Sequence, residues 1–278
     1  MSRAASMLLM SVVILLVGTA FRRPAVVAAI TLMSVDQEIA IGREANAKVR
    51  NEVPELTDAG VRAYVRGIVQ RLVRVAPGPK YPYAVSVANY REINAFALPG
   101  GPLWINRGVL HAATNESQVA GVLAHEIAHI AERHAADQMT KALATNFGLG
   151  MLGAFLGNSG GAGAAKAAAG LLANSMFMKF SRDDELEADR AGLQMLVRAG
   201  WNGRGMVELF EILRRESRRD PLQVETFFSS HPAPADRIAA LKSRVARAGS
   251  SGRRDSQEFR TVKVRLRKMS PARAMPQE

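Results

Sequence analysis

Apolar residues spaced three and four positions apart run through most of this chain, which is the pattern of amphipathic helices. Residues 35–50 and 58–75 both show it, and Asp58 stands where it can cap the second segment. The same spacing returns over residues 115–139. The pattern therefore predicts a mostly helical protein. Four later segments share it: 182–200, 204–217, 234–247 and 256–269.

One region departs from the helical period. Over residues 81–110, β-branched and aromatic residues alternate with small ones, and the Pro-Gly-Gly-Pro run at 99–102 forms a turn. We expect two or three short antiparallel strands here. With the surrounding helices they predict the α+β class, mostly helical, with one small antiparallel sheet.

A long apolar segment at residues 142–180 is rich in Gly and Ala. The glycine-rich run at 157–163 interrupts it, and Lys166 adds a charge. Each remaining stretch is about fifteen residues long, short of the roughly 20 that a membrane-spanning helix needs. We expect two packed helices joined by a flexible glycine hinge, placed as a lid over a site.

The N-terminal residues 1–29 have the architecture of a signal peptide. A basic start at Arg3 is followed by an apolar run at 7–17 and by the small residues at 18–20. The apolar stretch ends before Arg22 and is short for a spanning helix. A retained membrane anchor is the alternative, and both interpretations send the rest of the chain across a membrane.

Composition allows a globular domain with a real core, because 48% of the 278 residues are apolar and 22% are charged. Cysteine is absent. This excludes disulfides, a thiolate nucleophile and a thiolate zinc site, so imidazole and carboxylate must hold any metal.

The net charge of +12 is concentrated near the C-terminus. From residue 242 onward, eleven Lys or Arg side chains stand against three acidic ones, a surplus of eight. Phe259 is the one aromatic residue there, and nucleic-acid binders of single strands use several. We therefore expect no nucleic-acid partner and favour attraction to an anionic membrane surface.

Three of the five histidines lie within residues 125–134. On a helix His125 and His129 share one face, and Glu126 lies beside them. This is the H-E-x-x-H motif, in which two histidines bind zinc and the glutamate serves as general base. His134 follows nine residues after His125, which on a continuous helix turns it to the opposite face, so we expect it to be structural.

A third ligand should be a carboxylate from another helix. Residues 185–189 (ELEAD) supply one, because Glu185 and Asp189 are four apart on a shared face. Glu185 is the candidate ligand, and Asp189 is placed to accept a hydrogen bond from a ligand imidazole. Glu187 lies about 200° around the helix and is the poorer candidate.

The blocks HEIAHIAERH and SRDDELEADRAG resemble the zinc metallopeptidase group that includes HtpX, BepA and the CAAX prenyl proteases. The resemblance extends to residues 94–110 and 230–241. It implies a gluzincin domain with the HExxH motif on its active-site helix, and a soluble member of periplasmic type. We therefore expect three parts: a signal peptide or N-terminal anchor at 1–29, the zinc metallopeptidase domain at 35–247, and a basic C-terminal linker and helix at 248–278.

The resemblance also implies roles for individual residues. One zinc ion would be held by His125, His129 and Glu185, with Glu126 as the general base. His231 would reach the active site and either steady the oxyanion or restrain access to zinc. A sheet edge would pair with an extended substrate through the backbone of four residues: Asn94, Ala95, Phe96 and Ala97.

The sequence thus predicts a zinc metalloendopeptidase in the periplasm, or anchored at the inner membrane and facing the periplasm. The resemblance implies unfolded or misassembled envelope proteins as its substrates. A peptide-binding chaperone that uses the sheet edge while the metal site stays closed is the alternative. A basic adaptor for lipid or nucleic acid is a third possibility, in which residues after 247 would carry the activity.

Overall fold

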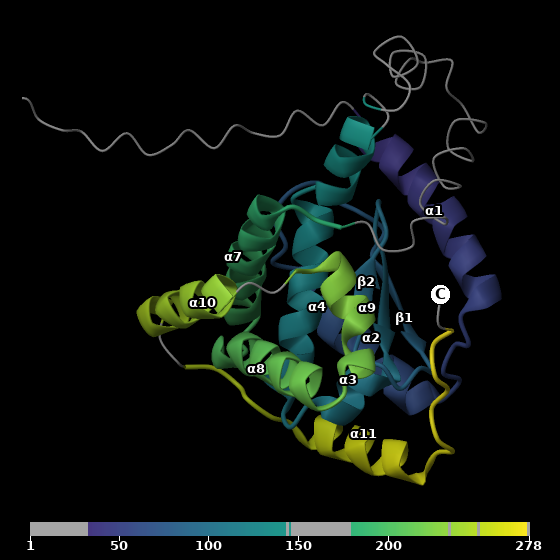
Figure 1. The fold of residues 1–278 in the computed structure, drawn as a ribbon, viewed down its shortest axis with the longest axis vertical. Helices are drawn as coiled ribbons and strands as arrows, with labels where there is room; N and C mark the ends of the chain where they lie inside the picture. Colours follow the sequence, from purple (N-terminus) through teal and green to yellow (C-terminus); the bar gives the residue numbers. More distant parts are fainter. Residues whose placement is uncertain (1–32, 143–144, 146–178, 233–234, 249–250, 277–278) are drawn as a thin grey trace, which may run out of the picture. The chain divides into compact units, whose positions relative to one another are not determined.

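The computed structural model describes residues 33–142, 145, 179–232, 235–248 and 251–276, all within one compact unit (Figure 1). The mostly helical α+β class is confirmed. The elements, in chain order, are α1 (Val35–Glu52), α2 (Ala59–Val73), β1 (Ala84–Ala88), β2 (Ala95–Ala97), β3 (Pro102–Asn106), α3 (Arg107–Ala112), α4 (Glu116–Ala131), α7 (Arg182–Arg198), α8 (Arg204–Arg219), the 3-10 turn η1 (Pro221–Gln223), α9 (Glu225–Ser230), α10 (Ala235–Ala248) and α11 (Gln257–Lys268).

The three strands form a mixed sheet in the order β1-β3-β2. β2 and β3 pair antiparallel, as predicted, with Ala95 opposite Ile105. β1 pairs parallel with β3, so the prediction of a wholly antiparallel sheet was wrong for this pair. The alternation of side chains identifies a strand but not its direction. Because the β2–β3 hairpin folds back with β3 in the middle, β3 runs in the same direction as β1.

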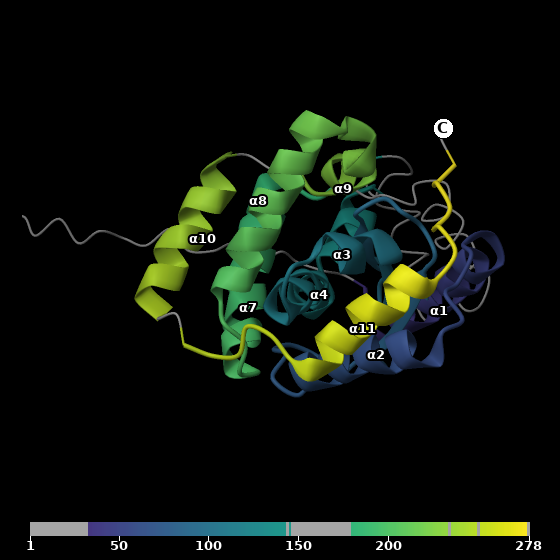
Figure 2. The same ribbon diagram turned by 90° about the horizontal axis from the view of Figure 1, so that it is seen from below.

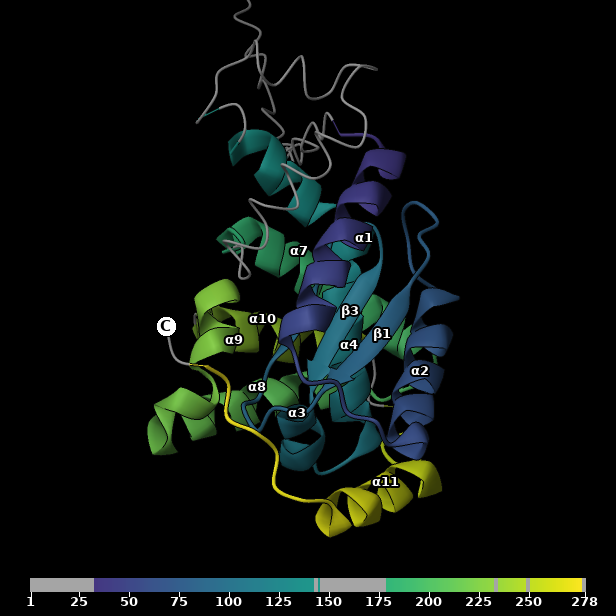
Figure 3. The same cartoon turned by 90° about the vertical axis from the view of Figure 1, so that its right-hand side faces the viewer.

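The sheet separates two parts of the core (Figure 3). Along β3, Trp104 faces α1 and stacks on Phe96, while its indole Nε1 donates to Asn46 at 2.9 Å. Leu103 and Ile105, one position to either side, face the opposite cluster with α2 and α4. The alternation of side chains predicted for this region thus buries residues on both faces of β3.

Helix α4 is the centre of the unit. It packs against α7, α8, α2 and the sheet, and all of its residues are buried. Figure 2 looks nearly along its axis and shows the other helices around it. Because α4 meets protein on every side, the polar side chains of the HExxH motif are held away from solvent.

The predicted continuous helix over 115–139 was wrong at one point. α4 ends at Ala131, residues 132–133 form a turn, and residues 134–142 are helical again. Arg133 has a φ of 64° and its Nε donates to the buried carboxylate of Glu38 at 2.6 Å. This positive φ ends the helix and changes the direction of the chain just before His134.

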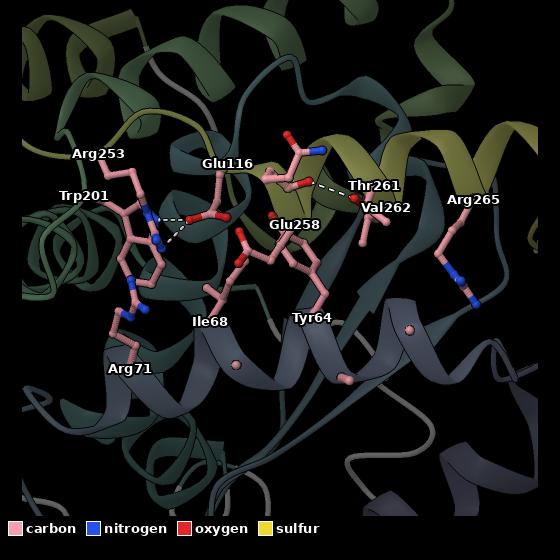
Figure 4. A pocket seen from close by; sticks show the side chains of 14 residues that line it. Tyr64, Ile68, Arg71, Glu116, Trp201, Arg253, Glu258, Thr261, Val262 and Arg265 are labelled. Carbon is pink, nitrogen blue, oxygen red and sulfur yellow. Dashed lines mark hydrogen bonds and ion pairs between the residues drawn. The ribbon is translucent and has the colours of Figure 1, made fainter.

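The C-terminal helix α11 packs on α2 through Phe259, Val262 and Leu266, as its helical spacing predicted. A cavity of about 550 Å³ lies between these two helices (Figure 4). In its wall the Trp201 ring lies between the guanidinium groups of Arg71 and Arg253. No residue of the metal-site cluster described below lines this cavity.

Among the described residues, no helix is both long and apolar enough to cross a bilayer. The predicted signal peptide or anchor at 1–29 lies outside the described residues, as does most of the predicted lid at 142–180. The division into three parts stays a prediction.

Candidate metal centre

Four side chains from three places in the sequence converge between α4 and α7. His125 and His129 come from α4, Glu185 from α7, and His231 from the residue after α9. Each offers one ligand atom, and these atoms all lie within 4.8 Å of one another. His125 Nε2 is 3.1 Å from His129 Nε2 and 3.4 Å from Glu185 Oε2. His129 Nε2 is 3.5 Å from Glu185 Oε1.

These spacings fit a metal ion. Bonds of 2.0–2.1 Å in a tetrahedral zinc site place neighbouring ligand atoms about 3.3–3.4 Å apart. The three separations among His125, His129 and Glu185 run from 3.1 to 3.5 Å. Two imidazole nitrogens and a carboxylate are also a donor set suited to zinc. The residues present can therefore hold such an ion.

Local structure explains why the ligands meet. Positions four apart on α4 put both histidines on one face. α7 begins at a capping box in which Ser181 Oγ accepts from the Asp184 backbone N–H, and this places Glu185 in the first turn, facing α4. Farther along α7, Gly192 lets the two helices come close: a Cβ there would lie 3.1 Å from the Ala124 carbonyl oxygen.

His231 also joins this cluster. Its Nδ1 lies 2.9 Å from Glu185 Oε1 and 3.4 Å from His125 Nε2. Its ring stacks on Phe227, which fixes its plane. The sequence left two roles open for His231, and the structure places its nitrogen among the ligand atoms.

Glu126 is the anomaly of the site. Its side chain is buried, yet neither carboxylate oxygen has a hydrogen-bond partner within the described part of the chain. The nearest ring nitrogen, His231 Nε2, is 3.6 Å away. Burial raises the pKa of Glu126, and the interaction with His231 offsets part of that shift. Buried carboxylates are normally paired, so an orphan beside a ligand cluster points to chemistry.

Asp189 and Arg237 form a buried layer behind the ligands. Asp189 Oδ1 lies 3.2 Å from His125 Nδ1, where a hydrogen bond from that imidazole was predicted. Arg237 donates to both oxygens of Asp189 at 2.8 Å, and its Nη1 lies 2.5 Å from Glu185 Oε2. Burial alone would raise the pKa of Asp189, but Arg237 and His125 hold it below its ordinary value.

The protonation of the two motif histidines differs. Burial opposes protonation of His125, but the carboxylates of Asp189 and Glu185 outweigh it and raise the pKa to about 9. Burial lowers the pKa of His129 well below its ordinary value, and the neighbouring imidazoles add to this. His129 is thus neutral, the form that binds metal, whereas a metal must displace a proton from His125.

Sequence reasoning missed Arg237 and Phe180, and it misplaced His134. A signal for the burial of Arg237 was present in the sequence. Arg237 lies four positions before Leu241, which is buried, so both share the apolar face of one helix. His134 was placed on the wrong face, since the break after Ala131 brings its Nδ1 to 2.9 Å from His129 Nδ1. It is not part of the four-residue cluster. Phe180 stacks on His129 at 4.0 Å and carried no signal in the sequence.

Of the residues predicted to receive substrate, Ala95, Phe96 and Ala97 form β2 at one edge of the sheet, and Asn94 directly precedes this strand. The Asn94 carbonyl accepts from Asn106 N–H, and Leu98 N–H donates to Pro102. By the alternation of antiparallel pairing, the backbone groups of Ala95 and Ala97 point away from β3. Ala97 also lines a small cleft together with His129. The side chains of Asn94, Ala95 and Phe96 are buried.

A buried HExxH helix joined by a glutamate from a second helix is the arrangement of a His₂Glu metallopeptidase centre. Residues 60–245 match the sequence model of peptidase family M48, and the chain belongs to this family. This confirms the family resemblance seen in the sequence.

Two groups of relatives are similar to the chain. It is 32% identical to the beta-barrel assembly-enhancing protease of Escherichia coli strain K12 over 240 residues, which cover 84% of this chain and 49% of that protein. The protein of that name from Yersinia pestis is 31% identical over 241 residues, with the same coverage. The mitochondrial metalloendopeptidase OMA1 of Saccharomyces cerevisiae is 33% identical over 158 residues, which cover 56% of this chain and 44% of OMA1. The chain spans about half the length of these relatives.

Proposed function

We propose that this protein is a zinc-dependent metalloendopeptidase with one zinc ion per chain. The observation that carries the proposal is the buried, unpartnered carboxylate of Glu126 beside four ligand atoms within 4.8 Å of one another. Membership of a peptidase family supports it. A structural metal site would leave no reason to bury an unpaired carboxylate next to the ligands.

His125, His129 and Glu185 would hold the zinc ion, which acts as a Lewis acid on water and on the scissile carbonyl. Glu126 accepts a proton from the attacking water and delivers it to the leaving amine. Its raised pKa makes the carboxylate a better base for taking the proton from water. Asp189 Oδ1 lies 3.2 Å from His125 Nδ1 and is placed to accept from it, which would leave Nε2 to face the metal.

His231 has the position of a further ligand. With its Nδ1 at 3.4 Å from His125 Nε2, it occupies space that an incoming carbonyl oxygen would need. This favours restraint of access over oxyanion stabilisation in the arrangement seen here.

The names of the relatives guide the choice of substrate. Two are named for enhancing assembly of beta-barrels. We propose that the chain cleaves unfolded or misassembled envelope proteins in the periplasm, or at the inner membrane facing it. The outward backbone groups of Ala95 and Ala97 would take an extended segment as an added strand. Pairing of this kind ignores side-chain identity and suits varied unfolded substrates.

A peptide-binding chaperone is the second candidate. The closeness of His231 to the ligand atoms favours it, because a permanently closed site would leave the β2 edge as the functional surface. The two candidates differ in one measurable property, which is cleavage that depends on zinc.

The test compares wild type with Glu126→Gln in degradation of unfolded casein, with metal content measured on the same samples. The amide cannot accept the proton, so cleavage should fall on the order of 10²–10⁴-fold. One zinc per chain should remain in the variant. Glu44→Gln, which makes the same change at an exposed position on α1, should match wild type.

Wild-type rates in Glu126→Gln would show that another group is the base. Casein binding by zinc-loaded wild type, with no cleavage that a chelator abolishes, would favour the chaperone instead.

A further inference from the structure

A groove lies along the later part of the α7–α10 pair. The first halves of these helices are joined by Arg237 and Asp189. Beyond that link, the two helices border a groove of about 420 Å³. Its size is within the range of about 300–1,000 Å³ typical of small-molecule pockets. Figures 1 and 2 show α10 beside α7.

The groove joins an apolar floor to a strongly basic wall. Leu193 and Val197 of α7 form the floor. The wall carries the side chains of Arg190, Arg198, Arg244 and Arg247, and no acidic residue lines the groove.

Three of these arginines have no counter-charge among the residues that the structure describes. Arg190 pairs with Glu187 at 3.0 Å. Arg198, Arg244 and Arg247 form no ion pair with any described residue, although Arg247 donates to Ser243 Oγ. Outside the described residues, the sequence contains one acidic side chain, Glu278. The chain itself therefore offers few other partners for these arginines. We therefore expect another molecule to supply the anion that balances these arginines.

A plain explanation for basic residues here is the helix dipole. Arg198 and Arg247 lie in the last turns of α7 and α10, where a cation is favourable. Two helix ends, however, supply only about one negative charge together, at roughly 0.5 each. The three unpaired guanidinium groups therefore leave the groove with a net charge of about +2 after the helix ends are counted.

The walls decide which anion fits best. Both are helical, and beyond the first turn of a helix every backbone N–H group is already bonded within the helix. A bound peptide would therefore find no free backbone N–H groups there for its carbonyl groups. A phosphate suits planar guanidinium groups, and a hydrocarbon chain suits Leu193 and Val197, because it needs no hydrogen bonds.

We propose that this groove binds a single anionic phospholipid, with its phosphate on Arg198, Arg244 and Arg247 and the start of an acyl chain on Leu193 and Val197. The site is independent of the proposed peptidase activity. It shares only Arg244 and Arg247 with the basic residues from 242 onward that the sequence pointed to for membrane attraction. Several tail charges are already used within the protein: Arg265 pairs with Asp58, Arg254 with Glu208, and Lys263 donates to carbonyls at the end of α3.

The test is calorimetric titration of the full chain with three soluble probes. These are dihexanoyl phosphatidylglycerol below its micelle concentration, dihexanoyl phosphatidylcholine, and inorganic phosphate. The first should bind most tightly, because it alone offers both a net negative headgroup and an acyl chain. Equal binding of the phosphatidylcholine, or of phosphate alone, would overturn the proposal.

Two triple variants that each lose three positive charges are compared, one in the groove and one elsewhere as the control. The groove variant Arg198→Gln/Arg244→Gln/Arg247→Gln should bind phosphatidylglycerol at least tenfold more weakly, since each charge-assisted contact is worth about tenfold or more. The control Arg66→Gln/Arg267→Gln/Lys268→Gln removes three exposed charges elsewhere and should stay within about twofold of wild type. Equal weakening in both would mean bulk charge, and the groove assignment would fail.

A milder variant covers the case in which the triple change unfolds the protein. Gln194 is exposed and lines the same groove, so Gln194→Glu adds a negative charge with no change of shape. It should weaken phosphatidylglycerol binding several-fold, while the melting temperature and casein cleavage stay as in wild type. Unchanged binding in Gln194→Glu, or tighter binding of a polyglutamate peptide than of the lipid, would overturn the proposal.

Discussion

Arg237 shows how one residue can decide the behaviour of several others. Its side chain is 1% exposed and contacts the carboxylates of both Asp189 and Glu185. Burial alone would lower its pKa, but Asp189 raises it above its ordinary value. Two nitrogens of its guanidinium group donate to the two oxygens of Asp189, which holds that carboxylate against His125. We therefore regard Arg237 as a positioning residue for the metal ligands.

Replacing Arg237 with Lys should weaken zinc binding by about 10–100-fold, which is typical for loss of a group that orients a ligand. Lysine keeps the charge but cannot bond both carboxylates in a planar fork. Zinc affinity, measured by competition with a chelating dye, gives the result without a cleavage assay. Arg66→Lys, at an exposed position on α2, is the control. Unchanged zinc affinity in Arg237→Lys would mean that Arg237 only balances charge.

At the scale of elements, the contact between α4 and α7 sets the distance between the ligands. Gly192 lies less than one turn beyond Asp189, and its Cα faces the Ala124 carbonyl and the His125 backbone. Both neighbours are backbone atoms of a buried helix, which cannot move aside easily. Any side chain at position 192 would therefore push α7, and with it Glu185, away from the histidines.

Gly192→Ala should lower the free energy of unfolding by about 1–2 kcal/mol, as is usual for overpacking. Zinc affinity should fall with it. In an open helix the same change stabilises by up to about 1 kcal/mol, because alanine is the better helix former. Gly67→Ala on α2 provides this control, since nothing lies within 4 Å of the added carbon. Urea unfolding of both variants measures the difference, and equal stabilisation in the two would contradict a tight contact.

At the scale of the whole described unit, the C-terminal segment is built into the fold. Arg265 of α11 donates through Nε and Nη2 to the two oxygens of Asp58, which also caps α2. The hydrogen bonds from Arg265 hold the pKa of Asp58 below its ordinary value. The ion pair therefore stabilises the folded state when Asp58 is ionised.

Asp58→Asn keeps a good capping residue and removes the charge. We expect a loss of about 0.5–1 kcal/mol near pH 7, limited because Arg265 is half-exposed and screened by solvent. The folded pKa is the lower one, so this stability is present above the unfolded pKa of about 3.9 and is lost as the pH falls through the folded value. Wild type and variant should thus converge at acidic pH.

Urea unfolding from pH 7 down to the lowest pH at which both chains fold measures this convergence. Arg265→Gln should cost a similar amount, and the double variant should cost less than the sum. Fully additive losses, or a difference that grows towards acid pH, would show that the pair does not link α11 to α2.

The sequence by itself determined the helical class, most helix positions and the HExxH residues. These follow from local spacing: residues four apart share a helix face wherever the helix packs. His125 and His129 needed no knowledge of the rest of the chain. The four-residue spacing of Glu185 and Asp189 also indicated the third ligand. The family resemblance added His231 because its block is recognisable as sequence.

Only the tertiary structure decided how distant segments meet. His125 and His231 are 106 positions apart, and Arg237 reaches Asp189 across 48. Such contacts depend on how α4, α7 and α10 pack, which no local period encodes. The same holds for the parallel β1–β3 pair, since strand direction is set by the order in which strands pair. Periodicity alone would continue the helix through residue 134. The positive φ of Arg133, whose side chain contacts the buried Glu38, breaks the helix and places His134 on the metal side.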